Sequence, residues 1–174
     1  ALNTKEIEDF AADCYNHAEI CKMQHKNDSA AYWLEMSANI DTLNVRWQIE
    51  TGLVFNKYMA NYNTALQYYH RALFVMGDDN SSDAIAAIVY NNIGTVYYDQ
   101  GYLSNALENL HKALKISSEV YGENDPIVAT SYNNIGALYS EQCDYVKAGE
   151  YYQRALKINL EALGESHPDV AMCY

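Results

Sequence analysis

Residues 87–100 read AIVYNNIGTVYYDQ, and residues 129–142 read ATSYNNIGALYSEQ. These two stretches lie 42 residues apart, and the similarity extends well beyond them. When residues 87–132 are laid over residues 129–174, 21 of 46 positions are identical. A fixed period in this range is typical of stacked-repeat architectures. Such proteins carry function on an extended surface, and not in a single catalytic cleft.

Each copy of the repeat has the pattern of two helices joined by a turn. In residues 125–164, Asp125 is suited to cap a helix whose first residue is Pro126. A turn at Cys143 and Asp144 then separates two stripes of apolar residues at helical spacing, and Gly164 suits the end of the second helix. The first stripe contains Val128, Tyr132, Ile135, Leu138 and Tyr139; the second contains Tyr145, Ala148, Tyr152, Ala155, Leu156 and Ile158. We therefore predict one pair of antiparallel helices per repeat.

Small residues occur where these helices must approach closely. Gly94 and Gly136 fall inside the first helix of their pairs, where a glycine costs about 1 kcal/mol relative to alanine. Close packing against a neighbouring helix would compensate for that cost. The small residues of the second helices are Ala106, Ala113, Ala148 and Ala155.

The order of these residues resembles the tetratricopeptide repeat. One copy matches at Tyr90, Ile93, Gly94, Tyr97, Ala106, Leu110 and Ala113, and the next at Tyr132, Ile135, Gly136, Tyr139, Ala148, Tyr152 and Ala155. The 42-residue spacing resembles the longer variant typified by kinesin light chains. The resemblance implies an all-α fold, a right-handed superhelical solenoid of antiparallel helix pairs. It also implies that the first helices line a concave groove.

Two weaker copies precede the clear ones. The second helix of one matches at Ala65, Tyr69 and Ala72, and its first helix would carry Ile49, Gly52 and Phe55, with one extra residue in the turn. The earliest copy matches at Ala30, Leu34 and Ser37, after a first helix near residues 9–23 that has Ala18 at the small position. We therefore expect a single array over residues 1–174. Its repeats are expected at about 9–43, 44–80, 83–122 and 125–164, with an unfinished fifth repeat at 168–174.

Composition excludes several functional classes. The net charge of −12 argues against nucleic acid or an anionic membrane as the main partner. Solubility explains this charge most simply; steering of basic partners is the alternative. No segment is apolar enough to predict a membrane span. The four cysteines form no CxxC pair, which suits free thiols in a reducing compartment. We therefore expect a cytoplasmic protein.

No motif predicts an enzyme, a cofactor site or a metal site. Cys14, His17, Cys21 and His25 follow one another at helical spacing, but they span about 16 Å of helix, which is too far for one ion. A core role is the preferred interpretation, and a metal bound by an adjacent Cys/His pair is the alternative. The acidic residues Asp78, Asp79 and Asp83 lack the glycine and glutamate of a calcium loop. We interpret them instead as part of a solvent-exposed connection between two repeats, with Asp83 as a helix N-cap.

The paired asparagines of the YNNIG segments are the strongest functional signal. A side-chain amide both donates and accepts hydrogen bonds, so a ladder of amides suits the main chain of a peptide. The resemblance to kinesin-light-chain repeats implies this role for Asn91, Asn92, Asn133 and Asn134. The alternative is that one amide of each pair bonds a neighbouring helix. The other residues expected in the groove are Thr95, Tyr98, Asp99, Glu141, Arg46 and Lys57.

These observations predict a non-enzymatic scaffold that binds an extended or helical peptide of a protein partner along its groove. Two alternatives remain open. In the first, the repeats are a regulatory segment within a larger signalling or ATPase protein. In the second, they are a module that self-associates through its unfinished last repeat.

Overall fold

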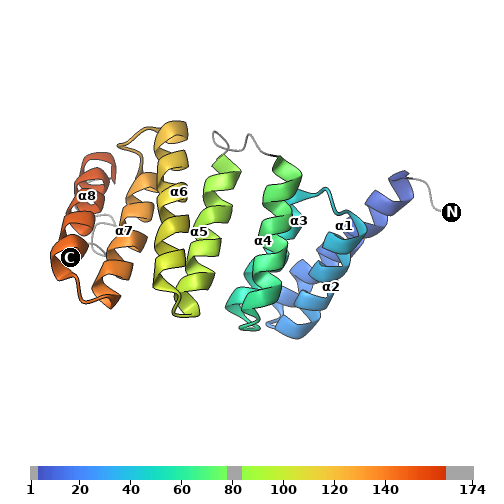
Figure 1. The fold of residues 1–174 in the computed structure, drawn as a ribbon. Coiled ribbons are helices and arrows are strands. Elements are labelled where there is room, and N and C mark those ends of the chain that lie inside the picture. Colours follow the sequence, from blue (N-terminus) through green and yellow to red (C-terminus); the bar gives the residue numbers. More distant parts are fainter. Residues whose placement is uncertain (1–3, 78–83, 164–174) are drawn as a thin grey trace. The chain divides into compact units, whose positions relative to one another are not determined.

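The computed structural model describes residues 4–77 and 84–163, which form α-helices and contain no β-strand (Figure 1). The chain divides into two compact units, residues 1–78 and 79–174. The helices of the first unit are α1 (Thr4–Met23), α2 (Asn27–Ile40), α3 (Val45–Lys57) and α4 (Tyr62–Met76). Those of the second are α5 (Ala84–Asp99), α6 (Leu103–Tyr121), α7 (Pro126–Glu141) and α8 (Tyr145–Leu163).

Consecutive helices pack in pairs. The pairs α1/α2, α3/α4, α5/α6 and α7/α8 make the most extensive contacts, and within each unit the second helix of one pair packs on the first helix of the next. Helix α5 begins at Ala84 and α7 begins 42 residues later, at Pro126. The same offset separates the starts of α6 and α8. The predicted helix pairs and their period are therefore present in the structure.

The predicted start of α7 is confirmed. The carboxylate of Asp125 accepts a hydrogen bond of 2.8 Å from the backbone N–H of Ile127, and Pro126 is the first helical residue. This arrangement satisfies one of the N–H groups that the first helical turn leaves unpaired. Helix α1 differs from the prediction because it begins at Thr4, earlier than residue 9.

Each turn inside a pair contains one residue in the left-handed conformation. The residues are His25 (φ 57°), Ala60 (φ 48°), Gly101 (φ 78°) and Cys143 (φ 59°). In three of the turns a backbone N–H bonds a carbonyl five residues earlier, as from Asp144 to Tyr139 at 2.9 Å. In the α3/α4 turn, the bond from Asn61 reaches back six residues, to Phe55. The extra residue predicted for this turn is therefore present.

The glycines inside the first helices lie against large side chains of their partner helices. A Cβ atom on Gly94 would be 2.8 Å from Cγ of Leu110, and one on Gly136 would be 2.8 Å from the ring of Tyr152. Gly52 is in the same relationship with Tyr69. The close packing predicted at these glycines is therefore present in the structure.

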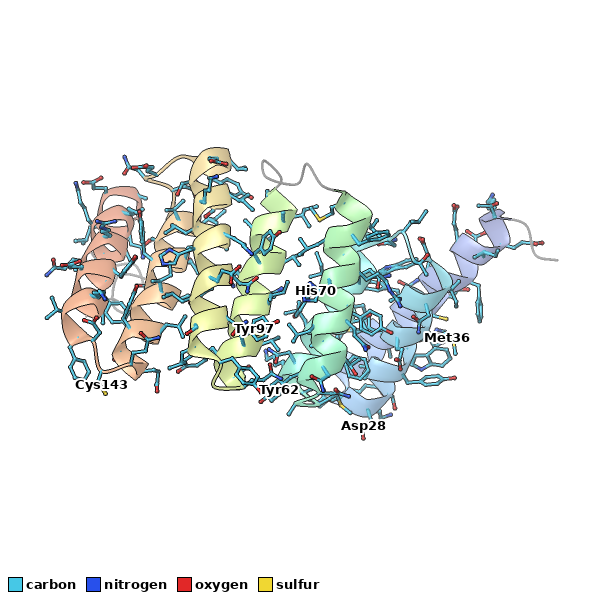
Figure 2. The ribbon with its side chains drawn as sticks, in the orientation of Figure 1. Asp28, Met36, Tyr62, His70, Tyr97 and Cys143 are labelled. Atoms are coloured by element: carbon cyan, nitrogen blue, oxygen red, sulfur yellow. The ribbon has the colours of Figure 1, made fainter. Side chains whose placement is uncertain are left out.

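The residues of the predicted stripes are buried or half-buried, with one exception. The small residues Ala106, Ala113, Ala148 and Ala155 are almost fully buried. Tyr145 is wrong as a member of the second stripe, because 68% of its surface is exposed. It is the first residue of α8, where the helix has only just left the turn that Cys143 occupies (Figure 2). Across the described ranges, no helix is both long and apolar enough to span a bilayer.

Gly164 and the start of a fifth repeat at 168–174 lie outside the described residues, as do Asp78, Asp79 and Asp83.

Candidate functional site

Two pockets lie along the line where α5 and α7 run beside each other over α6, here called the α5–α7 seam. Pocket N has a volume of about 270 Å³. It is lined by Ala84, Ala87, Ile88 and Asn91 of α5, Ser117 and Tyr121 of α6, and Ile127, Thr130 and Ser131 of α7. Pocket C has a volume of about 220 Å³. It is lined by Gly94, Thr95, Tyr98 and Asp99 of α5, Leu110 of α6, and Asn134, Ala137 and Leu138 of α7.

The lining residues follow each other at spacings of three and four on both α5 and α7. Residues at these spacings occupy one face of a helix. Both pockets therefore open along the same face of α5 and the same face of α7. Pocket N lies toward the N-terminal ends of these helices, and pocket C lies toward their C-terminal ends.

An amide–amide hydrogen bond crosses the seam between the pockets. Nδ2 of Asn134 donates to Oδ1 of Asn91 at 2.7 Å. Asn91 lines pocket N, and Asn134 lines pocket C. One asparagine from each YNNIG segment therefore joins neighbouring repeats, as the alternative interpretation predicted for one amide of each pair. The bond uses one donor of Asn134 and one acceptor site of Asn91, and a side-chain amide has two donors and an oxygen with two lone pairs.

The other two asparagines are half-buried. Nδ2 of Asn92 is buried and has no hydrogen-bond partner, whereas Asn133 does take part in an interaction. Thr95 is held to its own helix, because its hydroxyl donates to the carbonyl of Asn91 at 3.1 Å. The four asparagines of the two segments are therefore not equivalent.

A second side-chain bond crosses the seam at the C-terminal ends of α5 and α7. The hydroxyl of Tyr98 donates to Oε1 of Glu141 at 3.2 Å. Partial burial, together with this bond to a carboxylate, raises the pKa of Tyr98 above its usual value. The exposed carboxylate of Asp99 adjoins it on α5. Tyr98, Asp99 and Glu141, three of the predicted groove residues, thus lie at one end of pocket C.

The seam is acidic at this end. Asp99 and Glu141 are the last residues of α5 and α7, and they are the only charged residues of these two helices. The C-terminus of a helix adds a partial negative charge. Within residues 84–163, every lysine and arginine belongs to α6 or α8. The field at the open end of pocket C therefore favours a cation.

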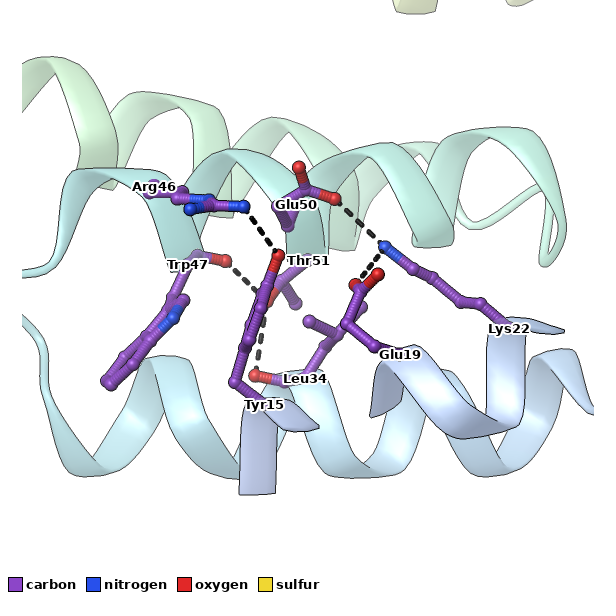
Figure 3. Close-up of polar contacts among 8 residues, drawn as sticks. All are labelled: Tyr15, Glu19, Lys22, Leu34, Arg46, Trp47, Glu50 and Thr51. Carbon is purple, nitrogen blue, oxygen red and sulfur yellow. Dashed lines mark hydrogen bonds and ion pairs between the residues drawn. The ribbon is translucent and has the colours of Figure 1, made fainter. Parts of the chain in front are cut away.

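The predicted groove residues of the first unit lie on α3. Nη2 of Arg46 donates to the hydroxyl of Tyr15 at 3.1 Å, and its guanidinium lies 5.4 Å from the Tyr15 ring centroid (Figure 3). The ammonium of Lys57 lies 5.2 Å from the ring centroid of Tyr58. The two cations are 11 residues apart on one helix, or about 16 Å. They are therefore too far apart to hold one small anion together.

Lys22, a third cation of this unit, is neutralised by two carboxylates. Its ammonium lies 2.6 Å from Glu19 and 3.0 Å from Glu50, which reaches it from α3 (Figure 3). Burial opposes the charge, but the hydrogen bonds to these carboxylates outweigh it and raise the pKa of Lys22. Lys22 therefore ties α1 to α3 and offers little net charge to a ligand.

The Cys/His row of α1 separates in the structure. Cys14 is buried and Cys21 is half-buried, in line with the core interpretation. His17 is exposed, so the core interpretation is wrong for it; its ring stacks on Trp33 with centroids 5.0 Å apart. His25 lies in the turn after α1. Among the described residues, no three His, Cys, Asp or Glu side chains are grouped to hold a metal.

The sequence did not single out most of the pocket residues, because apolar side chains such as Ile88 and Ile127 carry no chemical motif. Leu110 was identified only as a match to the repeat. Its role as floor of pocket C follows from its position 16 residues after Gly94, against which it packs. The helical period identifies the face of each residue, so the lining was in principle predictable from α5 and α7.

The repeats of this chain match known proteins in sequence and in fold. Residues 85–160 match the tetratricopeptide repeat family model. The crystal structure of BtubC (BKLC) from P. vanneervenii is similar with a TM-score of 0.78 and 25% identity, over 91% of this chain and 66% of that chain. A crystal structure of MamA protein has a TM-score of 0.68 at 15% identity, over 95% of this chain and 81% of that one. No curated protein matches the chain in sequence.

Residues 85–160 are tetratricopeptide repeats, and the fold class of the chain is the all-α helical-repeat solenoid. The chain spans slightly less than two thirds of the BtubC chain. Repeats of this kind form interaction surfaces, so residues 85–160 support a role as a protein–protein interaction scaffold.

Proposed function

We propose that the chain binds a peptide segment of a protein partner along the α5–α7 seam. The observation that carries this proposal is the arrangement of two pockets on either side of an amide–amide bond. Apolar pockets accept side chains, and convergent polar groups orient the bound chain. Asn91 and Asn134 supply such groups between the pockets, and Tyr98 supplies another at the edge of pocket C.

The helices that form the seam are positioned by buried contacts. Leu110 lies against Gly94 under pocket C, and Leu138 is 1% exposed. A surface that is already formed loses little conformational entropy when it binds. The seam therefore suits recognition of a flexible segment, whose ordering is then the main entropic cost.

The proposal is tested with a phage-displayed library of random dodecapeptides selected on the folded chain. Ala137→Leu fills pocket C, and Thr130→Leu, at an exposed position, fills pocket N. Ala162→Leu on the exposed surface of α8 is the matched control. Selected peptides are titrated against each variant by fluorescence polarisation, and helicity is checked by circular dichroism.

We expect at least one selected peptide to lose about tenfold or more in affinity for each pocket-filled variant, with unchanged affinity for the control. If no selected peptide discriminates between the pocket-filled variants and the control, the seam is not the binding surface.

A further inference from the structure

The dimensions of the pockets limit what each of them accepts. Pocket N and pocket C measure about 270 and 220 Å³, below the roughly 300–1,000 Å³ of pockets that enclose a small-molecule ligand. Each is of a size for one apolar side chain. Buried apolar residues in their linings support this reading, because Leu110 and Leu138 close pocket C and Ala87 contributes to pocket N.

The distance between the pockets follows from their lining residues. On α5 the two sets of residues are centred about nine positions apart, and on α7 about seven, which corresponds to roughly 10–14 Å along the helices. An extended peptide rises about 3.3 Å per residue, so it covers this distance in three or four residues. Its side chains alternate between faces, so only an even spacing directs both side chains into the seam. The spacing is therefore four.

The amide bond between the pockets favours an extended ligand over a helical one. An extended peptide that places side chains in both pockets carries three residues across Asn91 and Asn134. Its backbone N–H and C=O groups there need partners, and the remaining donors and acceptors of the two amides are suited to them. A helical ligand satisfies its backbone groups internally and would leave these amides unused.

Charge defines one end of the ligand. Asp99 and Glu141 lie at the C-terminal ends of α5 and α7, beside pocket C, and no lysine or arginine belongs to either helix. Glu141 accepts one hydrogen bond from Tyr98, and a carboxylate accepts several. Two of the basic residues on α6 and α8 are engaged within their own repeats: Lys112 pairs with Glu108 at 2.7 Å, and Lys147 pairs with Asp144 at 2.9 Å.

We propose that the seam recognises an extended segment with two apolar side chains four residues apart, followed on the pocket C side by a lysine or arginine. This inference rests on the proposed function and specifies its ligand. Pocket N and pocket C hold the apolar side chains, the amides of Asn91 and Asn134 bond the backbone between them, and Asp99 and Glu141 pair with the cation.

The test uses fluorescein-labelled decapeptides of serine and threonine with leucine at positions 3 and 7. One peptide has arginine at position 9, and a second has it at position 1, because the structure leaves both chain directions open. Comparison peptides move the second leucine to position 6 or replace arginine by glutamate. Each is titrated against the folded chain, against Asp99→Asn/Glu141→Gln, and against Glu150→Gln, an exposed carboxylate of α8 that lines neither pocket.

We expect one of the two arginine peptides to bind. Moving its second leucine should weaken binding about tenfold or more, since one side chain then points away from its pocket. Exchanging arginine for glutamate, or neutralising Asp99 and Glu141, should weaken it about fivefold to tenfold at low salt and less at high salt. Glu150→Gln should have no effect.

Equal binding of the peptides with leucine spacings of three and four would overturn the inference, as would equal binding of the arginine and glutamate peptides. Absence of binding at millimolar peptide would also overturn it. The proposed function is tested separately, because library peptides of any sequence that discriminate Ala137→Leu or Thr130→Leu from the control would still support a seam that binds peptides.

Discussion

The side chains of Asn91 and Asn134 are bonded to each other across 43 residues of sequence, with 2.7 Å between Nδ2 of Asn134 and Oδ1 of Asn91. Both are half-buried, so water competes only partly for the bond. The bond joins α5 directly to α7, whereas the main packing of these two helices in this region is against α6, which lies between them in the chain. The same two residues thus contribute to the packing of adjacent repeats and to the proposed binding surface.

This relationship predicts energetic coupling between the two residues. Asn91→Ala and Asn134→Ala should each lower the free energy of unfolding by about 1–2 kcal/mol, because each leaves the other amide without its partner. The double variant should lose less than the sum, with a coupling energy of about 1 kcal/mol. Urea unfolding followed by circular dichroism measures all four forms. Asn105→Ala, at an exposed position of α6, should combine additively with either; additivity between Asn91 and Asn134 would show that the bond does not stabilise the fold.

The glycines of the first helices should not tolerate alanine. Alanine at Gly94 or Gly136 gains about 1 kcal/mol of helix propensity but places Cβ 2.8 Å from Leu110 or Tyr152. Overpacking of this kind costs about 1–3 kcal/mol, so we expect a net loss in thermal or urea stability. Gly149 is the matched control, because a Cβ there meets no atom within 4 Å. Gly149→Ala should stabilise the chain, and an equal gain at Gly136 would contradict the packing argument.

The turn between α7 and α8 offers a stabilising substitution. Cys143 has φ of 59°, whereas the equivalent position of the preceding pair is Gly101, with φ of 78°. The left-handed conformation costs a non-glycine residue about 1–2 kcal/mol, and the greater freedom of glycine in the unfolded chain offsets part of the gain. Cys143→Gly should therefore raise stability by about 0.5–1 kcal/mol, and Gly101→Ala should lower it. A loss of stability in Cys143→Gly, or a gain in Gly101→Ala, measured by urea unfolding, would exclude this explanation.

Stability at alkaline pH should depend on Tyr69. Burial, with a smaller effect of Glu50, raises the pKa of Tyr69 well above its usual value of 10.0, and its side chain is fully buried. The unfolded chain releases this proton near pH 10, whereas the folded chain retains it. The stabilisation from neutral Tyr69 is therefore present below pH 10 and is lost as pH rises above it, by up to about 1.4 kcal/mol per pH unit.

The comparison of wild type with Tyr69→Phe isolates this effect. Between pH 8 and pH 11, unfolding in urea should show a steeper loss of stability for the wild type than for the phenylalanine variant. Tyr145→Phe, at a position that is 68% exposed, should follow the wild type. Parallel curves for wild type and Tyr69→Phe would mean that the folded chain does not keep Tyr69 protonated.

Local signals in the sequence were sufficient for the helices and their period. Asp125 and Pro126 predicted the start of α7, the glycines at positions 94 and 136 predicted close packing, and an extra residue was expected in the α3/α4 turn. These features depend on neighbours within a few residues or on the offset between the helices of one pair. The prediction for Tyr145 was wrong because it also rested on a local pattern. Helical spacing of apolar residues does not show that the first residue of a helix, next to a turn, is exposed to solvent.

The site was only partly predictable. The sequence singled out all four asparagines of the YNNIG segments but did not show which amide of each pair bonds a neighbouring helix. The structure bonds Asn91 to Asn134 and leaves Nδ2 of Asn92 without a partner. Nor did the sequence show that Lys22 is neutralised by Glu50, which lies 28 residues away in the chain. Which side chains meet across helices depends on the rotation and offset of packed helices, and no local pattern contains that information.

By itself, then, the sequence determined the paired helices, the 42-residue offset of the last repeats and the acidic character of α5 and α7, because these follow from residue types and from the geometry of a single helix. Only the tertiary structure decided that two pockets flank one amide–amide bond, and that Tyr98 reaches Glu141 on the next repeat. Those contacts join residues about one repeat apart, and they form only when packing brings the two helices together.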